Sequence, residues 1–238
     1  MRWIALLFAL GLTPALTPAA AQAPCRLALA LAFDVSRSVD RNDYRIQIDG
    51  ILAALADEGI RAALLDPSGA VALALYEWSG PEHQDIGVPW TVIRSTGDID
   101  AVMARIAAHR RDPRAQATGL GAALAAGRAL LRQAPGCAAL TLDVSGDGRS
   151  NVGPDPGSVH ARGDWAGITV NGLAIGGHES DIARYYEREV IRGPAAFVEF
   201  ARTHRDFPEA FRRKLYRELV EQVHGAAPGL APVGPVIR

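Results

Sequence analysis

An uninterrupted apolar segment, Leu-Ala-Leu-Ala-Leu-Ala-Phe at residues 27–33, constrains the fold more than any other feature of the sequence. It has no polar residue at alternate positions, so a strand formed from it is buried on both faces. The segment stops at Asp34, where a polar loop begins. We therefore expect a parallel sheet with helices on both sides.

Strand and helix patterns alternate along the rest of the chain. Further strand patterns occupy residues 70–76, 87–93, 139–145, 168–175 and 195–200, and apolar residues at helical spacing follow Asp40, Asp98, Gly119, Asp181 and Ala201. Pro89 cannot donate a ladder hydrogen bond, so 87–93 is predicted to be an edge strand. This alternation predicts a doubly wound α/β fold, with a mostly parallel six-stranded sheet and one antiparallel edge strand.

The two ends of the chain differ from this central part. Arg2, the apolar run 3–12 and the small residues up to Ala21 are typical of a signal peptide, which predicts export to the periplasm or secretion after removal of residues 1–21. The run is shorter than the roughly 20 residues of a membrane-spanning helix, and no later segment is a plausible span. Residues 22–224 are predicted to form one domain, and the Pro- and Gly-rich residues 225–238 a flexible tail.

The charge balance limits the kinds of partner. The chain has 25 Lys and Arg residues against 26 Asp and Glu residues, a formal net charge of −1. Proteins that bind nucleic acid through the phosphate backbone carry a basic surface. We therefore predict that the protein has no nucleic-acid partner.

The two cysteines precede two of the predicted strands at matching positions. Cys25 lies nine residues before Asp34, and Cys137 lies ten residues before Asp147. If the two strands are parallel neighbours, both sulfurs lie at one edge of the sheet, and disulfides persist in exported proteins. The sequence favours a Cys25–Cys137 disulfide over the alternative of two buried thiols.

Polar side chains follow two strands at the points where the strands end. Asp34, Ser36 and Ser38 leave the first strand on alternate residues, Asp147 follows the strand 139–145, and Thr118 stands at the start of an alanine-rich helix. Ligands of parallel sheets bind beyond the carboxyl ends of the strands. Carboxylate and hydroxyl oxygens suit Mg²⁺, Mn²⁺ or Ca²⁺ and disfavour zinc. The alternative is a turn whose Asp and Ser side chains cap the following helix.

Three motifs, D-V-S-R-S at 34–38, T-G-L at 118–120 and S-G-D-G at 145–148, make the chain resemble a von Willebrand factor A (vWA) domain. The resemblance is closer to a bacterial group of exported vWA-type domains of unknown function (DUF1194-like), through D-V-S-R-S-V-D at 34–40, Glu77-Trp78-Ser79-Gly80 and D-V-S-G-D-G at 143–148. It implies a metal-ion-dependent adhesion site (MIDAS) made of Asp34, Ser36, Ser38, Thr118 and Asp147. The implied ion is Mg²⁺, with Mn²⁺ or Ca²⁺ as alternatives. Arg37 replaces the glycine often found in the family, and the role of Asp143 stays open.

The resemblance implies a binding module that captures an Asp or Glu carboxylate of a protein partner through the cation. We expect the protein not to be an enzyme, because no catalytic base or nucleophile is identifiable and no histidine lies within the three motifs. Two alternatives remain, a metal-assisted hydrolase and a structural domain with a vestigial metal site.

Overall fold

The computed structural model describes residues 24–112 and 117–224. The predicted signal peptide, residues 1–21, and the predicted tail, residues 225–238, lie outside the described residues, so both stay predictions. Among the described residues, no helix is both long enough and apolar enough to cross a membrane.

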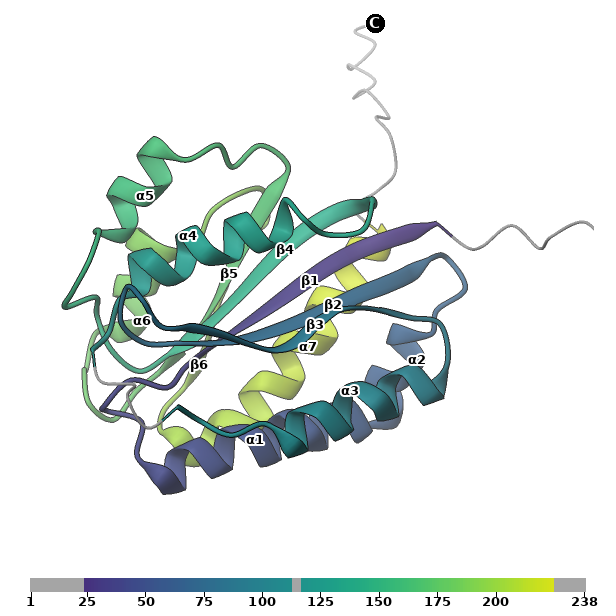
Figure 1. Ribbon diagram of the computed structural model, residues 1–238, viewed down its shortest axis with the longest axis horizontal. Helices are drawn as coiled ribbons and strands as arrows, with labels where there is room; N and C mark the ends of the chain where they lie inside the picture. Colours follow the sequence, from purple (N-terminus) through teal and green to yellow (C-terminus); the bar gives the residue numbers. More distant parts are fainter. Residues whose placement is uncertain (1–23, 113–116, 225–238) are drawn as a thin grey trace, which may run out of the picture.

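A six-stranded sheet forms the centre of the molecule (Figure 1). Its strands are β1 (Cys25–Asp34), β2 (Ala70–Trp78), β3 (Gln84–Ile93), β4 (Cys137–Gly146), β5 (Ile168–Ile175) and β6 (Val198–Ala201), in the order β3-β2-β1-β4-β5-β6. Only β3, the edge strand that contains Pro89, runs antiparallel to its neighbour. The predicted fold class is therefore confirmed.

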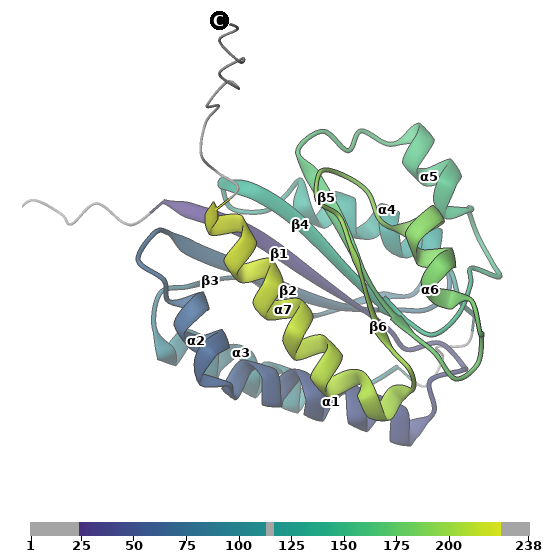
Figure 2. The same ribbon diagram turned by 180° about the vertical axis from the view of Figure 1, so that it is seen from behind.

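Helices cover both faces of the sheet (Figures 1 and 2). One face carries α1 (Arg41–Ala56), α2 (Glu58–Leu64), α3 (Thr96–Ala108) and α7 (Phe207–His224), and the other carries α4 (Leu120–Leu131), α5 (Pro156–Arg162) and α6 (Ile182–Tyr185), which continues as a π-helix, Tyr186–Val190. The short helices α2 and α5 were not predicted. A single turn of 3₁₀ helix, His204–Asp206, precedes α7.

Strand β1 separates two hydrophobic cores by its alternation of large and small residues. Its leucines and Phe33 pack into the core under α1, α3 and α7, whereas Ala28, Ala30 and Ala32 belong to the core under α4. Because alanine side chains are short, α4 approaches the sheet closely. A Cβ atom on Gly127 of α4 would lie only 2.5 Å from a methyl group of Leu142.

Side-chain caps fix where the helices near the predicted site begin. Asp40 accepts hydrogen bonds from the backbone amides of Asn42 and Asp43 at 2.6 and 2.8 Å, so α1 begins directly after the loop that contains Ser36 and Ser38. Helix α3 begins at Thr96, before Asp98, because Ser95 is its N-cap and Asp98 completes a capping box.

The two cysteines form a disulfide that joins β1 to β4. Cys25 and Cys137 face each other in the parallel register, with their Cα atoms 4.4 Å apart, and they are 112 residues apart in the sequence. The predicted pairing is confirmed.

We expect the double variant Cys25→Ser/Cys137→Ser to have a free energy of unfolding lower by about 4 to 5 kcal/mol, because a loop of this length loses much of its unfolded-state entropy when it is closed. Urea unfolding followed by circular dichroism measures the difference. Reduced wild type is the control and should match the variant. A loss below about 1 kcal/mol would contradict the expectation.

Candidate functional site

The predicted site residues lie at the topological switch point of the sheet. The chain passes from β1 to β2 on one side and later returns to place β4 on the other side of β1. In doubly wound sheets, such a point opens a crevice beyond the carboxyl ends of the two strands. Asp34 ends β1, Asp147 directly follows β4, and Thr118 lies two residues before α4.

Hydrogen bonds connect all five predicted residues. Oδ1 of Asp34 accepts the backbone amide of Ser36 at 2.7 Å, and the hydroxyl oxygens of Ser36 and Ser38 are 3.2 Å apart. Ser38 donates to Oδ1 of Asp147 at 2.7 Å, and Thr118 donates to Oγ of Ser36 at 3.2 Å. Both aspartates and Ser36 are 0% exposed. The structure therefore brings the two strand-end loops and the start of α4 into one cluster.

The second carboxylate oxygen of each aspartate is buried and accepts no hydrogen bond. These atoms are Oδ2 of Asp34 and Oδ2 of Asp147. Burial, followed by the neighbouring charge of Asp147, raises the pKa of Asp34 from its ordinary value to about 7. Two buried carboxylates that repel each other are stabilised when a cation lies between or beside them.

The donor set fits a hard divalent cation. Two carboxylates and three hydroxyls are oxygen ligands of the kind that Mg²⁺, Mn²⁺ and Ca²⁺ prefer. Within the described ranges, no group of three or more His, Cys, Asp or Glu side chains is placed to hold a metal ion. The cluster has only two such side chains, and its other candidate ligands are hydroxyls.

Two histidines that lie outside the three sequence motifs are beside Asp147. Nε2 of His178 is 3.7 Å and Nε2 of His204 is 3.9 Å from Oδ2 of Asp147, and Nδ1 of His204 is also 3.7 Å from Oδ1 of Asp43. His178 is the third residue after β5, and His204 is the third residue after β6. The strand-end rule that identified Asp34 and Asp147 therefore applies to both histidines as well.

Tyr186 forms the floor of the cluster. Its hydroxyl is buried without a hydrogen bond, and burial together with the charges of Asp34 and Asp147 raises the pKa of the phenol. A Cβ atom on Gly146 would lie 2.5 Å from this hydroxyl and 3.0 Å from Oδ2 of Asp34, so glycine is required between them. No sequence pattern points to Tyr186 as part of the site.

A cavity of about 500 Å³ opens next to the cluster. Its lining residues are Arg37, Ser38, Ala117, Thr118 and Asn151. Arg37 is exposed at its rim, and Oδ1 of Asn151 accepts the backbone amide of Thr118 at 3.0 Å. Two of the five predicted site residues, Ser38 and Thr118, therefore face open space beside a positive charge.

Arg111 holds the loop after β1 through two hydrogen bonds to its backbone. Its Nη2 donates to the carbonyl oxygens of Val35 and Ser36 at 2.8 and 2.9 Å, and its guanidinium lies 5.8 Å from the ring centre of Tyr44. Tyr44 in turn donates to the buried Glu77 at 2.6 Å. These contacts fix the backbone that presents Ser36 and Ser38.

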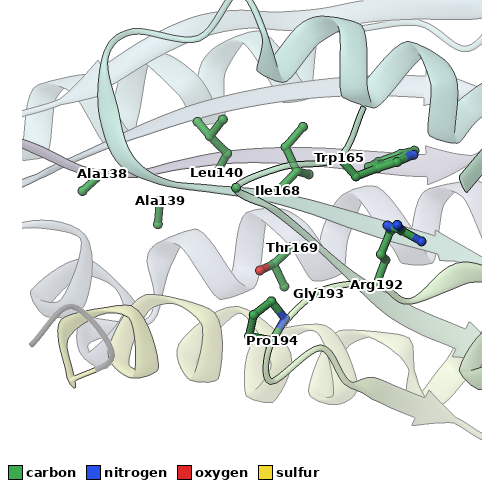
Figure 3. Close-up of a pocket in the computed structure, with 10 residues that line it drawn as sticks. Ala138, Ala139, Leu140, Trp165, Ile168, Thr169, Arg192, Gly193 and Pro194 are labelled. Carbon is green, nitrogen blue, oxygen red and sulfur yellow. The ribbon is translucent and has the colours of Figure 1, made fainter. Parts of the chain in front are cut away.

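A second cavity, of about 570 Å³, lies at the other end of the sheet (Figure 3). It is lined from the amino-terminal parts of β4 and β5 and the loop around Gly193, and Arg192 is the one charged side chain among its lining residues. None of the five predicted site residues lines it. The candidate metal ligands and the two neighbouring histidines lie at the opposite, carboxyl edge of the sheet.

Solved structures with the same fold include domains from animals and bacteria. Proximal thread matrix protein 1 from the mussel byssus, in a form with a zinc-occupied MIDAS motif, is 12% identical, covers 83% of this chain and 47% of its own, and has a TM-score of 0.59. A von Willebrand factor type A protein from Catenulispora acidiphila is 15% identical, covers 82% and 43%, and has a TM-score of 0.55.

The PilB minor pilin from Streptococcus sanguinis is 14% identical, covers 89% of this chain and 65% of its own, and has a TM-score of 0.62. The present chain spans about half the length of the mussel protein. At these identities the likeness establishes the fold alone, a vWA-like domain.

A search of curated protein sequences found no match. A family model described as "Protein of unknown function (DUF1194)" matches residues 24–223, which include all six strands. The resemblance predicted from the three motifs is therefore confirmed, and the chain belongs to the DUF1194 family as a domain with the vWA-like fold.

Proposed function

We propose that the protein is an exported binding module that holds a divalent cation at Asp34, Ser36, Ser38, Thr118 and Asp147 and captures an acidic group of a protein partner. The observation that supports it most directly is the pair of buried carboxylate oxygens, Oδ2 of Asp34 and Oδ2 of Asp147, that accept no hydrogen bond. A bound cation offsets the charge that burial makes costly.

The hydroxyls are the candidate direct ligands, and the aspartates orient them. Ser38 donates a hydrogen bond to Oδ1 of Asp147, so its oxygen keeps a lone pair that can face a cation. Thr118 donates a hydrogen bond to the hydroxyl oxygen of Ser36. Mg²⁺ keeps several water ligands in such sites, which lets the aspartates act partly through water.

The charges of the site favour an acidic ligand. Three neutral hydroxyls add no charge, so two aspartates at most neutralise the ion, and water-mediated contacts neutralise it less. The cavity beside Ser38 and Thr118 gives a ligand access, and Arg37 adds a positive charge at its rim. A carboxylate of Asp or Glu on a protein surface matches both features.

The comparisons support the class of function. One structural neighbour has zinc in its MIDAS motif, and another, SpaC from Lactobacillus rhamnosus GG, is a pilus adhesin. The names of two neighbours, a pilus adhesin and a minor pilin, describe proteins that act outside the cytoplasm. The Cys25–Cys137 disulfide of this chain fits export. We propose the periplasm as the location, with secretion as the alternative.

A metal-assisted hydrolase is the second candidate, and one observation favours it. His178 and His204 lie within 4 Å of Asp147, where the sequence motifs offered no base. Both contacts are longer than a hydrogen bond, and His204 also faces Asp43. Metal-dependent turnover on a panel of ester and phosphoester substrates, lost in Asp34→Asn, would establish this candidate in place of the binding module.

We expect Asp34→Asn and Asp147→Asn each to weaken Mg²⁺ and Mn²⁺ binding by at least about 10- to 100-fold, because each removes a charge from the ligand set and from the groups that orient it. Isothermal titration calorimetry measures the affinities. Asp100→Asn is the matched control, since its carboxylate is exposed on α3 and pairs with Arg61. Unchanged affinity in both site variants would refute the assignment.

Saturating Mg²⁺ should stabilise the wild-type domain and leave the Asp34→Asn domain unchanged. A ligand that binds only the folded state at 100 times its Kd adds about 2.7 kcal/mol to the free energy of unfolding. Thermal melts with Mg²⁺ and with chelator measure the effect. A wild-type melting temperature that is the same in both solutions would identify the site as vestigial.

Partner capture should depend both on the cation bound by this protein and on a carboxylate of the partner. Wild-type protein is expected to retain envelope proteins in Mg²⁺ and to release them in chelator or in excess of a glutamate-rich peptide, because a carboxylate completes the coordination. Asp34→Asn should retain none, and Asp100→Asn should match wild type. Capture that persists undiminished in chelator would defeat the proposal.

A further inference from the structure

The only lysine of the chain is fully buried between two carboxylates. Lys214 on α7 is 0% exposed, and its Nζ lies 2.6 Å from Oδ1 of Asp143 and 2.6 Å from Oε1 of Glu218. Asp143 is 1% and Glu218 is 3% exposed. Lysine, aspartate and glutamate are almost never fully buried unless they are paired, so this cluster, the Lys214 triad, is an unusual element of the core.

The fold places the members of the triad by register and helical spacing. Asp143 lies on β4 opposite Leu31 of β1 and Asn171 of β5, and Lys214 and Glu218 are four residues apart on α7. Asn171 donates through Nδ2 to Oε1 of Glu218 at 2.8 Å. The triad therefore connects the last helix to the two strands beneath it, away from the cavity beside Ser38.

The two carboxylates contact Lys214 in different ways. Glu218 accepts a hydrogen bond from Nζ, and its Oε1 is also held by Asn171. Neither oxygen of Asp143 has a hydrogen bond, although Nζ is 2.6 Å from one of them. The amine therefore lies beside the Asp143 carboxyl group without the geometry of an ordinary hydrogen bond. Because a C–O bond is about 1.2 Å long, Nζ lies within roughly 4 Å of the carboxyl carbon.

All three side chains of the triad are withdrawn from water. The ring centre of Phe197 is 5.5 Å from Nζ. The three side chains of the triad are buried between α7 and the sheet. Burial, followed by the charge of Asp143, raises the pKa of Glu218 to about 8, so this side chain holds a proton at neutral pH. A protonated carboxyl group beside a buried amine is a proton donor and acceptor in position for acyl transfer.

From this geometry we infer that Lys214 and Asp143 form an intramolecular isopeptide bond, with Glu218 as the catalytic proton carrier. The proposal is independent of the metal site.

The reaction needs no other reactant. A proton passes from the Lys214 ammonium to the Asp143 carboxylate, which leaves a neutral amine and a carboxylic acid. The Nζ lone pair attacks Cγ of Asp143 and forms the C–N bond, while Glu218 gives its proton to the departing oxygen and takes one from Nζ. The C–O bond breaks, one water leaves, Glu218 regains its proton, and no group is oxidised or reduced.

Intact mass spectrometry of the reduced and alkylated protein tests the bond. We expect the measured mass of wild type to be about 18 Da, one water, below the mass calculated from its sequence with alkylated cysteines. Glu218→Gln keeps the size of the side chain and leaves the Lys214–Asp143 pair balanced in charge, so it should fold and show the full mass. Glu209→Gln, on an exposed face of the same helix, is the matched control and should keep the loss.

A tryptic digest locates the bond. Cleavage at Arg132, Arg149, Arg213 and Arg217 should release residues 133–149 joined to residues 214–217 as one branched peptide. A link from Lys214 to Glu218, or a loss of about 17 Da that indicates ammonia from Asn171, would overturn the assignment to Asp143. Separate linear peptides for both segments would overturn the bond itself.

The single lysine allows a second, independent measurement. An amine-reactive reagent applied to unfolded protein should label only the terminal amine of wild type and of Glu209→Gln, because Lys214 is an amide in both. In Glu218→Gln it should label Lys214 as well. Full labelling of Lys214 in unfolded wild type would show an unreacted ion pair and refute the proposal.

Discussion

The parallel pairing of β1 with β4 is the contact on which the rest of the structure depends. Its register places Cys25 opposite Cys137 at one end and Phe33 opposite Ser145 at the other. Asp34 and Asp147 follow at the carboxyl edge, where both are fully buried. A slip of one residue would turn the alternating leucines of β1 toward α4 and separate the two aspartates. The disulfide holds the same register covalently, far from the site.

Much of the fold and of the site followed from the sequence, because both depend on local patterns. Apolar runs predicted the strands, and the polar ends of two strands predicted four of the candidate site residues. The start of the alanine-rich helix predicted the fifth, Thr118, and hydrogen bonds join all five. The short helices α2 and α5 have too few apolar residues to show a helical period. Tyr186 could not be predicted, because it approaches Asp34 only through the packing of a π-helix on β5.

Lys214 is a second residue whose contacts could not be predicted from the sequence. It is the only lysine in a chain rich in arginine, and the residues around it form no motif that points to a function. Nothing local indicates that its partner lies 71 residues earlier, on β4, since that contact exists only after α7 packs across the sheet. Asp143, whose role the sequence left open, contacts α7 in place of the metal cluster. A contact between distant segments that neither a strand end nor a pair of cysteines marks is thus not predicted by the sequence.

The interior of this protein holds two pairs of buried carboxylates, and the difference between them explains the site. Asp143 and Glu218 enclose the nitrogen of Lys214, so the chain itself removes their charge, through the proposed amide bond to Asp143 and the proton on Glu218. Asp34 and Asp147 are buried as completely, yet among the described contacts of Asp147 the only basic side chains are two histidines, both beyond hydrogen-bond distance. Burying like charges without compensation is costly. A cation taken from solution is the means of compensation that leaves a coordination position for a partner.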